Sequence, residues 1–484
     1  MAGLDARALA GRALLGGSLA YVLLVNLTLI VTSLVAPSPP DPWEAGQAIE
    51  AWRLRSGLPV YEDPDLGHAT HMYGPLATVG VAALQPLLGL DLAGPVLSLV
   101  SSLLLVMVLL AATRQGASRT HLWVCLALFV GIHHRSGEYF TASRPDMPAV
   151  LLGLSSLLLL RRACATGSPR LLTGGIALLV VGCLFKQTVA MVAAVPPLAL
   201  ALQHERRSWR DGLLHFAPLI GLLVVALVMR VVWPITYYYV FDVPRQYSIS
   251  FAGVAHGLWA LALHSPLALM LAWLQAAAGE HEEPWLLASL LVAIPASAVT
   301  FAKVGGSQNS WIPALVAIAV YSARRLGPVL TGLSRGDGGW GSSLVAPAFL
   351  GALLVLSALP RPLLRIGPWR AGGAATQEDY QATVSHVRQL SGVVVSPQDP
   401  TLVLRAGRTP GRNLYLELDA RGWPAGPPAP VLEELGGADH VVTVPPPPGV
   451  RDVLTPALLG AHGLKLISSR GGYSIWSREP GRAQ

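Results

Sequence analysis

The sequence predicts a polytopic α-helical membrane protein of about eleven spans, followed by a small C-terminal α/β domain. Hydrophobic residues make up 52% of the 484 residues, only 13% are charged, and the mean hydropathy is +0.52. Such values are typical of chains that cross a bilayer many times and not of soluble globular proteins. Beyond residue 359 the long apolar runs stop, so we expect a membrane domain over 1–359 and an extracytoplasmic domain over 360–484.

Charge and cysteine content exclude two other classes. The net charge of +7 is carried by arginines that cluster in short loops between apolar runs. That distribution follows the orientation rule for membrane proteins, so we expect no nucleic-acid partner. Cys125, Cys164 and Cys183 lie in or beside apolar runs, without metal-ligand spacing or a disulfide framework. We expect them to be packing residues.

The first apolar run, residues 13–36, is long enough to span the bilayer and follows Arg7 and Arg12. By the positive-inside rule, the N-terminus is expected in the cytoplasm and the next loop outside. A cleaved signal peptide is the alternative, but the run is long for a signal core and many spans follow. We therefore expect an uncleaved span.

The next apolar run, residues 76–90, is short and interrupted by glycine and proline. It is either a thin span or a helix on the membrane surface. The surface helix is preferred, because the strong run 94–113 then delivers Arg114 and Arg119 to the cytoplasm. The external loop with its juxtamembrane helices is thus expected over 37–93.

The same rule orients the remaining runs, with basic loops inside. The further expected spans are 122–132, 147–160, 171–185, 189–202, 213–232, 257–277, 284–300, 312–321 and 343–359. The further external loops are expected at 133–146, 233–251 and 301–311. Several runs are below spanning length, so their boundaries are placed only to within several residues. The tyrosines of 233–251 suit either an interfacial belt or a cleft for lipid head groups.

The C-terminal domain is expected to alternate short strands and helices. Strands are expected at 393–396, 402–405 and 440–444, and helices at 380–390 and 453–462. The proline-rich stretches 424–430 and 445–448 are expected as loops.

Polar groups gather on the external side of this predicted topology. They are Asp41, Glu44, Tyr61 to Asp65, His68 to Tyr73, Arg144, Asp146, Lys186, and Lys303 to Asn309. A charged side chain at mid-bilayer costs about 2.5 to 3.5 kcal/mol on insertion scales, so acids at span ends beside a cleft are more plausibly functional. Their convergence predicts an active site.

Each of these residues also has a structural explanation. Asp41 follows two prolines and suits a helix N-cap. Arg144 and Asp146 suit a loop ion pair, and Lys186 suits a side chain that reaches the interface. The adjacent His133 and His134 are a weak metal signal.

Five short motifs occur in order: DPWEAGQAIEAWRLRSGLPVYEDP (41–64), MYGPL (72–76), ASRPDMPA (142–149), FKQT (185–188) and KVGGSQN (303–309). Over about residues 13–325, this order resembles the GT-C superfamily of polyprenyl-phosphate-sugar-dependent glycosyltransferases. That group includes aminoarabinose transferases and protein O-mannosyltransferases.

The resemblance implies an inverting glycosyl transfer outside the cytoplasmic membrane, with Glu44 or Asp41 as general base. The family often has two adjacent acids here, whereas Pro42 and Trp43 separate these two. The choice stays open, with Glu44 preferred.

Negative charge develops on the leaving phosphate, and nearby cations stabilise it. The resemblance implies that these cations are among Arg144, Lys186 and Lys303. Asp146 would orient Arg144 or help to hold a divalent metal, whose presence stays undetermined. The remaining substrate-binding candidates are Tyr61, His71, Tyr73 and Asn309.

The expected partners are a polyprenyl-phosphate sugar donor, the lipid bilayer, and a glycan, lipid or protein acceptor of unknown identity. The alternative function is a transporter or flippase of a lipid-linked sugar, which would place ionisable groups at the bilayer midplane. A third is an assembly protein whose external domain binds partners. The charges gather at one membrane face instead, which favours the enzyme.

Overall fold

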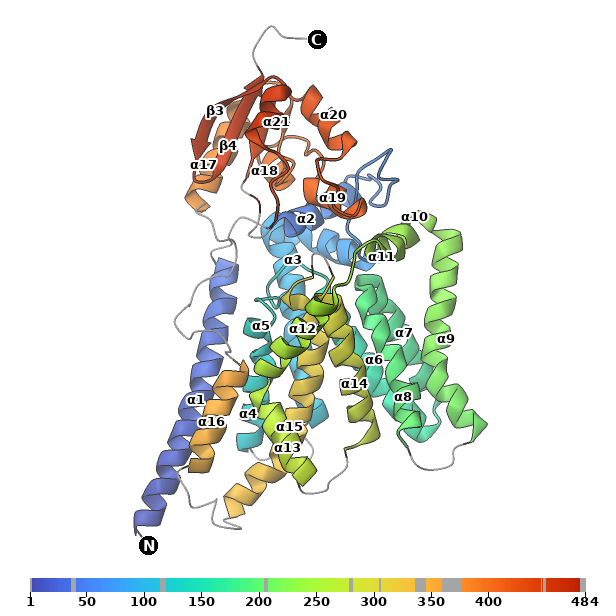
Figure 1. Cartoon of the computed structure of the whole chain (residues 1–484), viewed down its shortest axis with the longest axis vertical. Coiled ribbons are helices and arrows are strands. Elements are labelled where there is room, and N and C mark those ends of the chain that lie inside the picture. Colours follow the sequence, from blue (N-terminus) through green and yellow to red (C-terminus); the bar gives the residue numbers. More distant parts are fainter. Residues whose placement is uncertain are drawn as a thin grey trace.

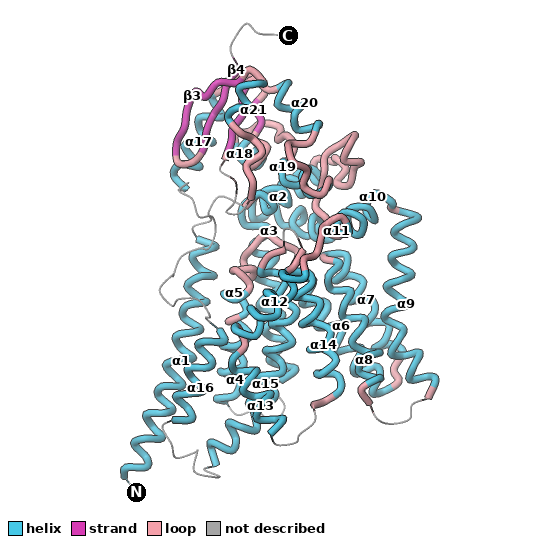
Figure 2. Tube along the Cα trace, in the orientation of Figure 1, coloured by secondary structure: helices cyan, strands magenta, loops and turns pink. Residues whose placement is uncertain are grey.

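The computed structural model describes residues 2–35, 41–113, 119–203, 208–277, 282–303, 306–335, 345–358, 377–444, 446 and 450–478. A tall helical bundle carries a smaller α/β segment, residues 377–478, at one end (Figure 1). We call it the C-terminal segment. The described strands that form the sheet lie in this segment, and many loops gather where it meets the bundle (Figure 2). The predicted boundary at 359/360 lies outside the described residues.

The elements of the bundle follow the predicted runs closely. In chain order they are α1 (Ala2–Val35), α2 (Pro42–Arg55), α3 (Pro75–Thr113), α4 (Arg119–Val130), α5 (Ile132–Arg135), α6 (Asp146–Thr166), α7 (Pro169–Phe185), the 3₁₀ helix η1 (Gln187–Ala194), α8 (Val195–Ala201), α9 (Trp209–Val232), α10 (Pro234–Tyr237), the π-helix η2 (Tyr238–Asp242), α11 (Val243–Arg245), α12 (Phe251–Leu263), α13 (Pro266–Ala277), α14 (Pro284–Phe301), the 3₁₀ helix η3 (Gln308–Trp311), α15 (Ile312–Arg335) and α16 (Val345–Ala358).

Within the described ranges, five helices are long and apolar enough to cross a membrane: α1, α3, α6, α9 and α14. A sixth candidate is the bent pair α12 and α13, whose axes differ by 81°. The apolar helices α7, η1 with α8, and α16 are shorter. The predicted polytopic helical fold is confirmed, while the number of about eleven spans stays a prediction.

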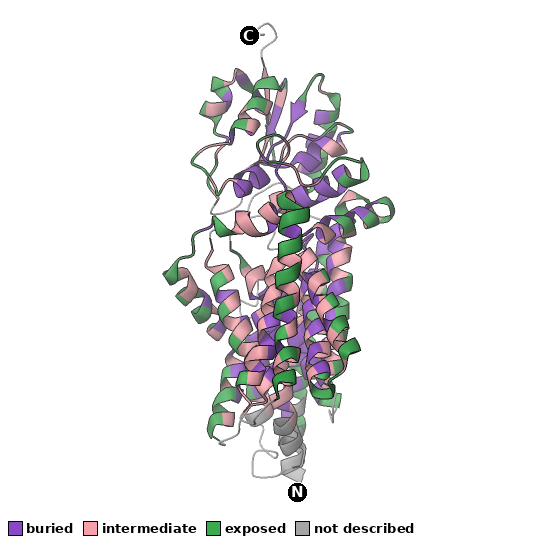
Figure 3. Cartoon of the chain, turned by 90° about the vertical axis from the view of Figure 1, so that its right-hand side faces the viewer, coloured by how far each residue is buried: buried purple, intermediate pink, exposed green. Residues whose placement is uncertain are grey.

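The outer surface of the bundle is apolar. On α9, which faces the viewer in Figure 3, Leu213, Phe216, Ile220 and Leu227 are exposed. The interior is packed by two large clusters, one of which joins α1, α4, α13, α15 and α16. Apolar groups on both sides of a helix are expected where its outer face meets lipid instead of water.

The helix α3 is broken at Gly89, whose φ of 76° lies in the left-handed region that glycine adopts without a steric penalty. The break divides a first part, over the predicted surface helix 76–90, from the long apolar part that follows. The first part packs on α2 through Ala51, Val81 and Ala82. It thereby forms a base for the polar residues that surround α2.

In the C-terminal segment, a four-stranded sheet has the order β1-β2-β4-β3, with β1 parallel to β2 and the other pairs antiparallel. The elements are α17 (Gln377–Gln389), β1 (Val394–Val395), α18 (Pro400–Arg405), α19 (Leu414–Ala420), α20 (Ala429–Gly437), β2 (His440–Thr443), α21 (Pro456–Ala461), β3 (Leu464–Arg470) and β4 (Tyr473–Arg478). Successive residues Val441 and Val442 point into different cores, so helices cover both faces of the sheet.

One predicted strand is wrong. Residues 402–405 belong to helix α18, because Asp399 caps the helix by accepting a hydrogen bond from the Thr401 backbone N–H, and Pro400 occupies the first turn. The predicted strands at 393–396 and 440–444 and the helices at 380–390 and 453–462 are present with shifted ends.

At the end of the bundle away from the C-terminal segment, predicted cytoplasmic loops meet. Glu283 forms ion pairs with Arg161 at 3.1 Å and with Arg324 at 2.9 Å, and Glu282 forms one with Arg325 at 2.7 Å. Three loops that the sequence places on one side therefore lie together in space.

Candidate active site

The site begins where α2 begins. Asp41 is the N-cap: its Oδ1 accepts hydrogen bonds from the backbone N–H groups of Trp43 at 2.9 Å and Glu44 at 2.8 Å. The same carboxylate accepts from Arg144, whose Nη2 lies 2.8 Å from each oxygen. Asp41 is therefore both a cap and a member of an ion pair.

The partners of this ion pair differ in exposure. The Arg144 side chain is 8% exposed, whereas that of Asp41 is 43% exposed. Burial would lower the pKa of the Arg144 guanidinium, but the Asp41 carboxylate raises it well above its usual value. Arg144 therefore stays charged. It binds Asp41 and not Asp146, so the loop ion pair considered from the sequence does not form.

Glu44, one turn further along α2, is only 4% exposed. Its Oε1 accepts a hydrogen bond from the Ser143 backbone N–H at 2.9 Å. This contact joins α2 to the loop that carries Arg144, across 99 residues of sequence. Of the two candidate bases, Asp41 is the one that a substrate can reach more readily.

A second ion pair lies on the other side of Tyr73. Lys186, at the end of α7, places its Nζ 2.6 Å from Oδ1 of Asp146, the first residue of α6. Lys186 also lies over the Tyr73 ring, 5.3 Å from its centre, and Arg144 lies 5.6 Å from the centre of the Trp43 ring. Each of the two ion pairs thus has its cation over an aromatic ring, Arg144 over Trp43 and Lys186 over Tyr73.

His71 and Tyr61 lie behind these rings. His71 faces Glu50 through Nδ1 at 2.8 Å and the Trp43 carbonyl through Nε2 at 2.8 Å. The Tyr61 hydroxyl donates to the Tyr73 carbonyl at 2.6 Å. Both predicted substrate-binding residues therefore contact backbone carbonyls of the site: Tyr61 contacts that of Tyr73, and His71 contacts that of Trp43.

Glu50 anchors this layer. It accepts hydrogen bonds from the hydroxyls of Thr70 and Thr78 and from the His71 backbone N–H. Burial would raise the pKa of its carboxyl, but the charge and hydrogen bonds of His71 and the Thr70 hydroxyl lower it below its usual value. Glu50 therefore stays ionised although it is buried.

Two neighbouring cavities lie in the bundle, and the Lys186–Asp146 pair lines one of them. The first is small and polar, and its lining includes Asp146, Lys186, Asn309, Ser297 and Thr300. The predicted residues Asp146, Lys186 and Asn309 are thus brought together, although they come from different parts of the chain.

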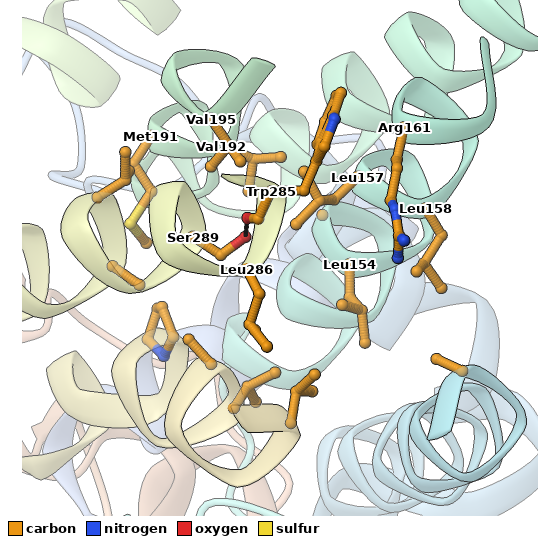
Figure 4. A pocket seen from close by; sticks show the side chains of 18 of the residues that line it. Leu154, Leu157, Leu158, Arg161, Met191, Val192, Val195, Trp285, Leu286 and Ser289 are labelled. Carbon is orange, nitrogen blue, oxygen red and sulfur yellow. Dashed lines mark hydrogen bonds between the residues drawn. The ribbon is translucent and has the colours of Figure 1, made fainter. Parts of the chain in front are cut away.

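The second cavity, of about 130 Å³, is lined mostly by apolar side chains, together with Arg161, Glu283 and Arg324, and shares Val150, Met191 and Pro313 with the first. Figure 4 shows its lining, in which Leu154, Leu157, Met191, Val192 and Leu286 face a common space. From Val150 to Arg161 it follows α6 for about 16 Å, at 1.5 Å per helical residue. A small polar cavity and a longer, mostly apolar cavity therefore lie next to each other inside the bundle.

Lys303 occupies a different place. Its Nζ donates to the Pro244 carbonyl at 3.1 Å, and burial lowers the pKa of its ammonium group. It is not part of the lining of either adjoining cavity. Arg144 and Asp41 also lie outside both linings, so Lys186 is the one of the three predicted cations that lines either of these cavities.

No three histidine, cysteine, aspartate or glutamate side chains in the described ranges converge as they would around a metal ion. His133 packs on Phe140, and its Nδ1 accepts from the Phe140 backbone N–H at 3.3 Å.

Several residues of the site were not predicted from the sequence. Trp43 and Glu50 lie inside a motif that the sequence singled out, and Tyr139 lies two residues after a glycine in the predicted loop 133–146. Desolvation raises the pKa of Tyr139 to about 12, with opposing effects from Arg144 and Asp146, which places this phenol beside the ion pairs. Their aromatic or acidic character was the available signal.

The fold is similar to that of known membrane glycosyltransferases. ArnT from Cupriavidus metallidurans bound to undecaprenyl phosphate matches with a TM-score of 0.58 and 14% identity, over 97% of this chain and 99% of that one. Apo ArnT matches with a TM-score of 0.57 and 16% identity, over 96% and 98%. Arabinofuranosyltransferase AftD from Mycobacteria matches with a TM-score of 0.50 and 13% identity, over 96% of this chain and 41% of that one.

No protein-family model and no curated protein sequence matches the chain. The structural similarity confirms the predicted GT-C fold, which extends over nearly the whole chain.

Proposed function

We propose that the chain is a glycosyltransferase that moves a sugar from a polyprenyl-phosphate donor to an acceptor hydroxyl, with inversion, at the outer face of the cytoplasmic membrane. One observation carries the proposal: the Lys186–Asp146 pair lines a polar cavity that shares Val150, Met191 and Pro313 with a mostly apolar cavity. An amphiphile with an anionic head and a long apolar tail suits this arrangement. The undecaprenyl phosphate bound to ArnT is a molecule of that chemistry.

The donor's phosphate would lie beside Lys186 and Arg144, and the first part of its tail would lie in the mostly apolar cavity between α6, α8, α14 and α15. The acceptor oxygen attacks the anomeric carbon while the bond from that carbon to the phosphate oxygen breaks. The electron pair of the broken bond stays on the phosphate, which leaves as a monoester. The two cations stabilise its growing negative charge. A single displacement of this kind inverts the anomeric carbon.

The acceptor hydroxyl must lose a proton in this step. We propose Asp41 instead of Glu44 as the group that receives it, because Asp41 is 43% exposed whereas Glu44 is 4% exposed and accepts from Ser143. Arg144 orients the Asp41 carboxylate. General bases of this kind typically contribute about 10²- to 10⁴-fold to the rate.

The test is sugar transfer from a polyprenyl-phosphate donor by the purified full chain in nanodiscs. Asp41→Asn and Lys186→Met are expected to lower transfer by about 10²-fold or more. The matched control is Lys465→Met, because Lys465 is an exposed lysine on β3 far along the chain from the site. If Asp41→Asn and Glu44→Gln both kept full transfer, the enzyme proposal for this site would be wrong.

The same preparation separates the alternatives. A flippase would move the lipid-linked sugar between the leaflets of a vesicle without releasing sugar from the phosphate. An assembly protein would do neither. Release of polyprenyl phosphate that depends on both acceptor and Asp41 supports transfer over both.

A further inference from the structure

Helix α19 of the C-terminal segment lies directly on the residues that begin α2. Asn413 Nδ2 donates to the Pro42 carbonyl at 2.8 Å, and the Ala69 backbone N–H donates to Glu417 Oε1 at 3.0 Å. A Cβ atom on Gly46 would lie 2.8 Å from Leu416 Cδ1, so the two helices approach at a distance that favours glycine. The C-terminal segment is therefore in contact with the proposed active site.

Asp419 makes the contact closest to the reacting groups. Its Oδ2 accepts a hydrogen bond from Trp43 Nε1 at 2.8 Å, a contact between residues 376 positions apart. Its Oδ1 accepts from Trp423 Nε1 at 2.7 Å and lies 3.1 Å from the Tyr247 hydroxyl. The side chain is buried, and in the described part of the chain it has no cationic partner within ion-pair distance.

Trp43 transmits this contact to the site. Its indole ring lies 5.6 Å from the guanidinium of Arg144, and its backbone N–H donates to Asp41 Oδ1. One face of the ring thus lies against Arg144. The indole N–H of the same ring is bound by Asp419. Burial raises the pKa of the Asp419 carboxyl, and the hydrogen bonds from Trp43 and Trp423 oppose that rise.

We propose that Asp419 is a positioning residue of the transfer reaction: it holds the Trp43 indole against Arg144 and thereby fixes Arg144 in its ion pair with Asp41. This inference rests on the proposed function. A displacement of about 1 Å at a reacting group can cost about 10²-fold in rate, so a side chain that touches no substrate can still control transfer.

Other contacts attach the C-terminal segment to the bundle. Arg421 binds Asp65 at 3.3 Å, the Tyr238 hydroxyl donates to the Ala420 carbonyl at 3.1 Å, and Arg405 binds Asp91. Attachment therefore does not depend on Asp419 alone. The loss of Asp419 is expected to act on the rate of transfer more than on docking of the segment.

The test is a double-mutant cycle on transfer by the full chain in nanodiscs, with Asp419→Asn, Trp43→Phe and the double variant. Each single change is expected to lower kcat about tenfold or more, with a smaller change in the KM for donor. Because phenylalanine has no indole N–H, Asp419→Asn should cause no further loss in the Trp43→Phe background. Losses that multiply in the double variant, or full transfer by Asp419→Asn, would overturn the inference.

The matched control is Asp399→Asn, the same chemical change in the same segment. Asp399 is as buried as Asp419, but its carboxylate caps α18 by accepting from Thr401 and does not reach the bundle's ion pairs. This variant should keep the wild-type rate. A loss equal to that of Asp419→Asn would assign the effect to general damage of the segment and overturn the inference.

A second readout needs no donor. The fluorescence of Trp43 is obtained by subtracting the spectrum of a Trp43→Phe variant from that of the same protein with Trp43. Acrylamide is then added, and the quenching of this difference is measured. Quenching of this component should increase in Asp419→Asn; unchanged quenching would overturn the inference. If the wild type transfers no sugar, the proposed function fails, while this readout still decides whether Asp419 holds Trp43.

Discussion

At the scale of single residues, Arg144 carries more of the site's organisation than any one carboxylate. One of its nitrogens lies between both oxygens of Asp41 while its guanidinium lies over Trp43. A lysine has a point charge that cannot make both contacts in the same geometry. We predict that Arg144→Lys lowers transfer at least about tenfold while the protein still folds.

The measurement for this prediction pairs transfer rate with thermal unfolding of the purified protein. Arg245→Lys is the control, because Arg245 is 69% exposed and its ion pair in the described part of the chain is with Asp242, three residues away. Retention of full transfer by Arg144→Lys would show that charge alone is enough.

Glu50 allows a prediction about stability and pH. Glu50 is buried among His71, Thr70 and Thr78, and Glu50→Gln replaces one of its two acceptor oxygens by an N–H₂ group, which is expected to cost about 1 to 3 kcal/mol. The pKa of Glu50 is lower in the folded state than its usual 4.5, so its contribution is present above pH 4.5 and is lost as the pH falls through the lowered value.

Thermal unfolding followed between pH 7 and pH 3 measures both effects. The wild type should lose stability below about pH 4.5, and Glu50→Gln should lose less over the same interval. Parallel curves for the two proteins would contradict the assignment of this dependence to Glu50.

The sequence made part of this residue layer predictable. Asp41, Arg144, Asp146 and Lys186 stand out because charges at span ends are costly unless they are used or paired. The specific pairings were not readable, since Asp41 and Arg144 are 103 residues apart. The contact of Trp43 with Asp419 had no signal at all in the sequence.

At the scale of elements, the break in α3 at Gly89 decides where α2 and the polar groups around it lie. Gly89, with φ of 76° and ψ of −178°, adopts a conformation that is essentially restricted to glycine and costs a residue with a Cβ about 1 to 3 kcal/mol. We predict that Gly89→Ala lowers thermal stability by about that amount and reduces transfer, because the first part of α3 supports α2 through Val81 and Ala82.

The matched control is Gly16→Ala. Gly16 lies inside α1 with nothing within 4 Å of an added Cβ, so alanine should keep or raise stability there. Equal behaviour of the two variants in thermal unfolding and transfer would contradict a special role for the break.

Long apolar runs were predicted correctly as helices because the bilayer imposes that solution. Local breaks were harder to place. The run 257–277 divides at Ser265, since Pro266 has no N–H with which to continue α12. The run 402–405 was predicted as a strand from its composition, but the cap at Asp399 determined a helix.

At the scale of the whole molecule, the two ends of the bundle carry different groups of polar residues. One end holds the ion pairs of Arg161, Arg324 and Arg325 with Glu282 and Glu283, and the other holds the proposed site and the C-terminal segment (Figure 1). Positively charged loops remain on the cytoplasmic side during insertion. The site and the C-terminal segment are then expected outside.

We predict that a reporter enzyme active only in the periplasm is active when fused after residue 484 and silent when fused near residue 207. A fluorescent protein that folds only in the cytoplasm, fused at the same positions, should give the opposite pattern and controls for expression. The reverse result in both series would place Asp41, Arg144 and Lys186 at the cytoplasmic face. Donor and acceptor would then have to meet on that side, and the proposed transfer at the outer face would be wrong even if the residues of the site were correct.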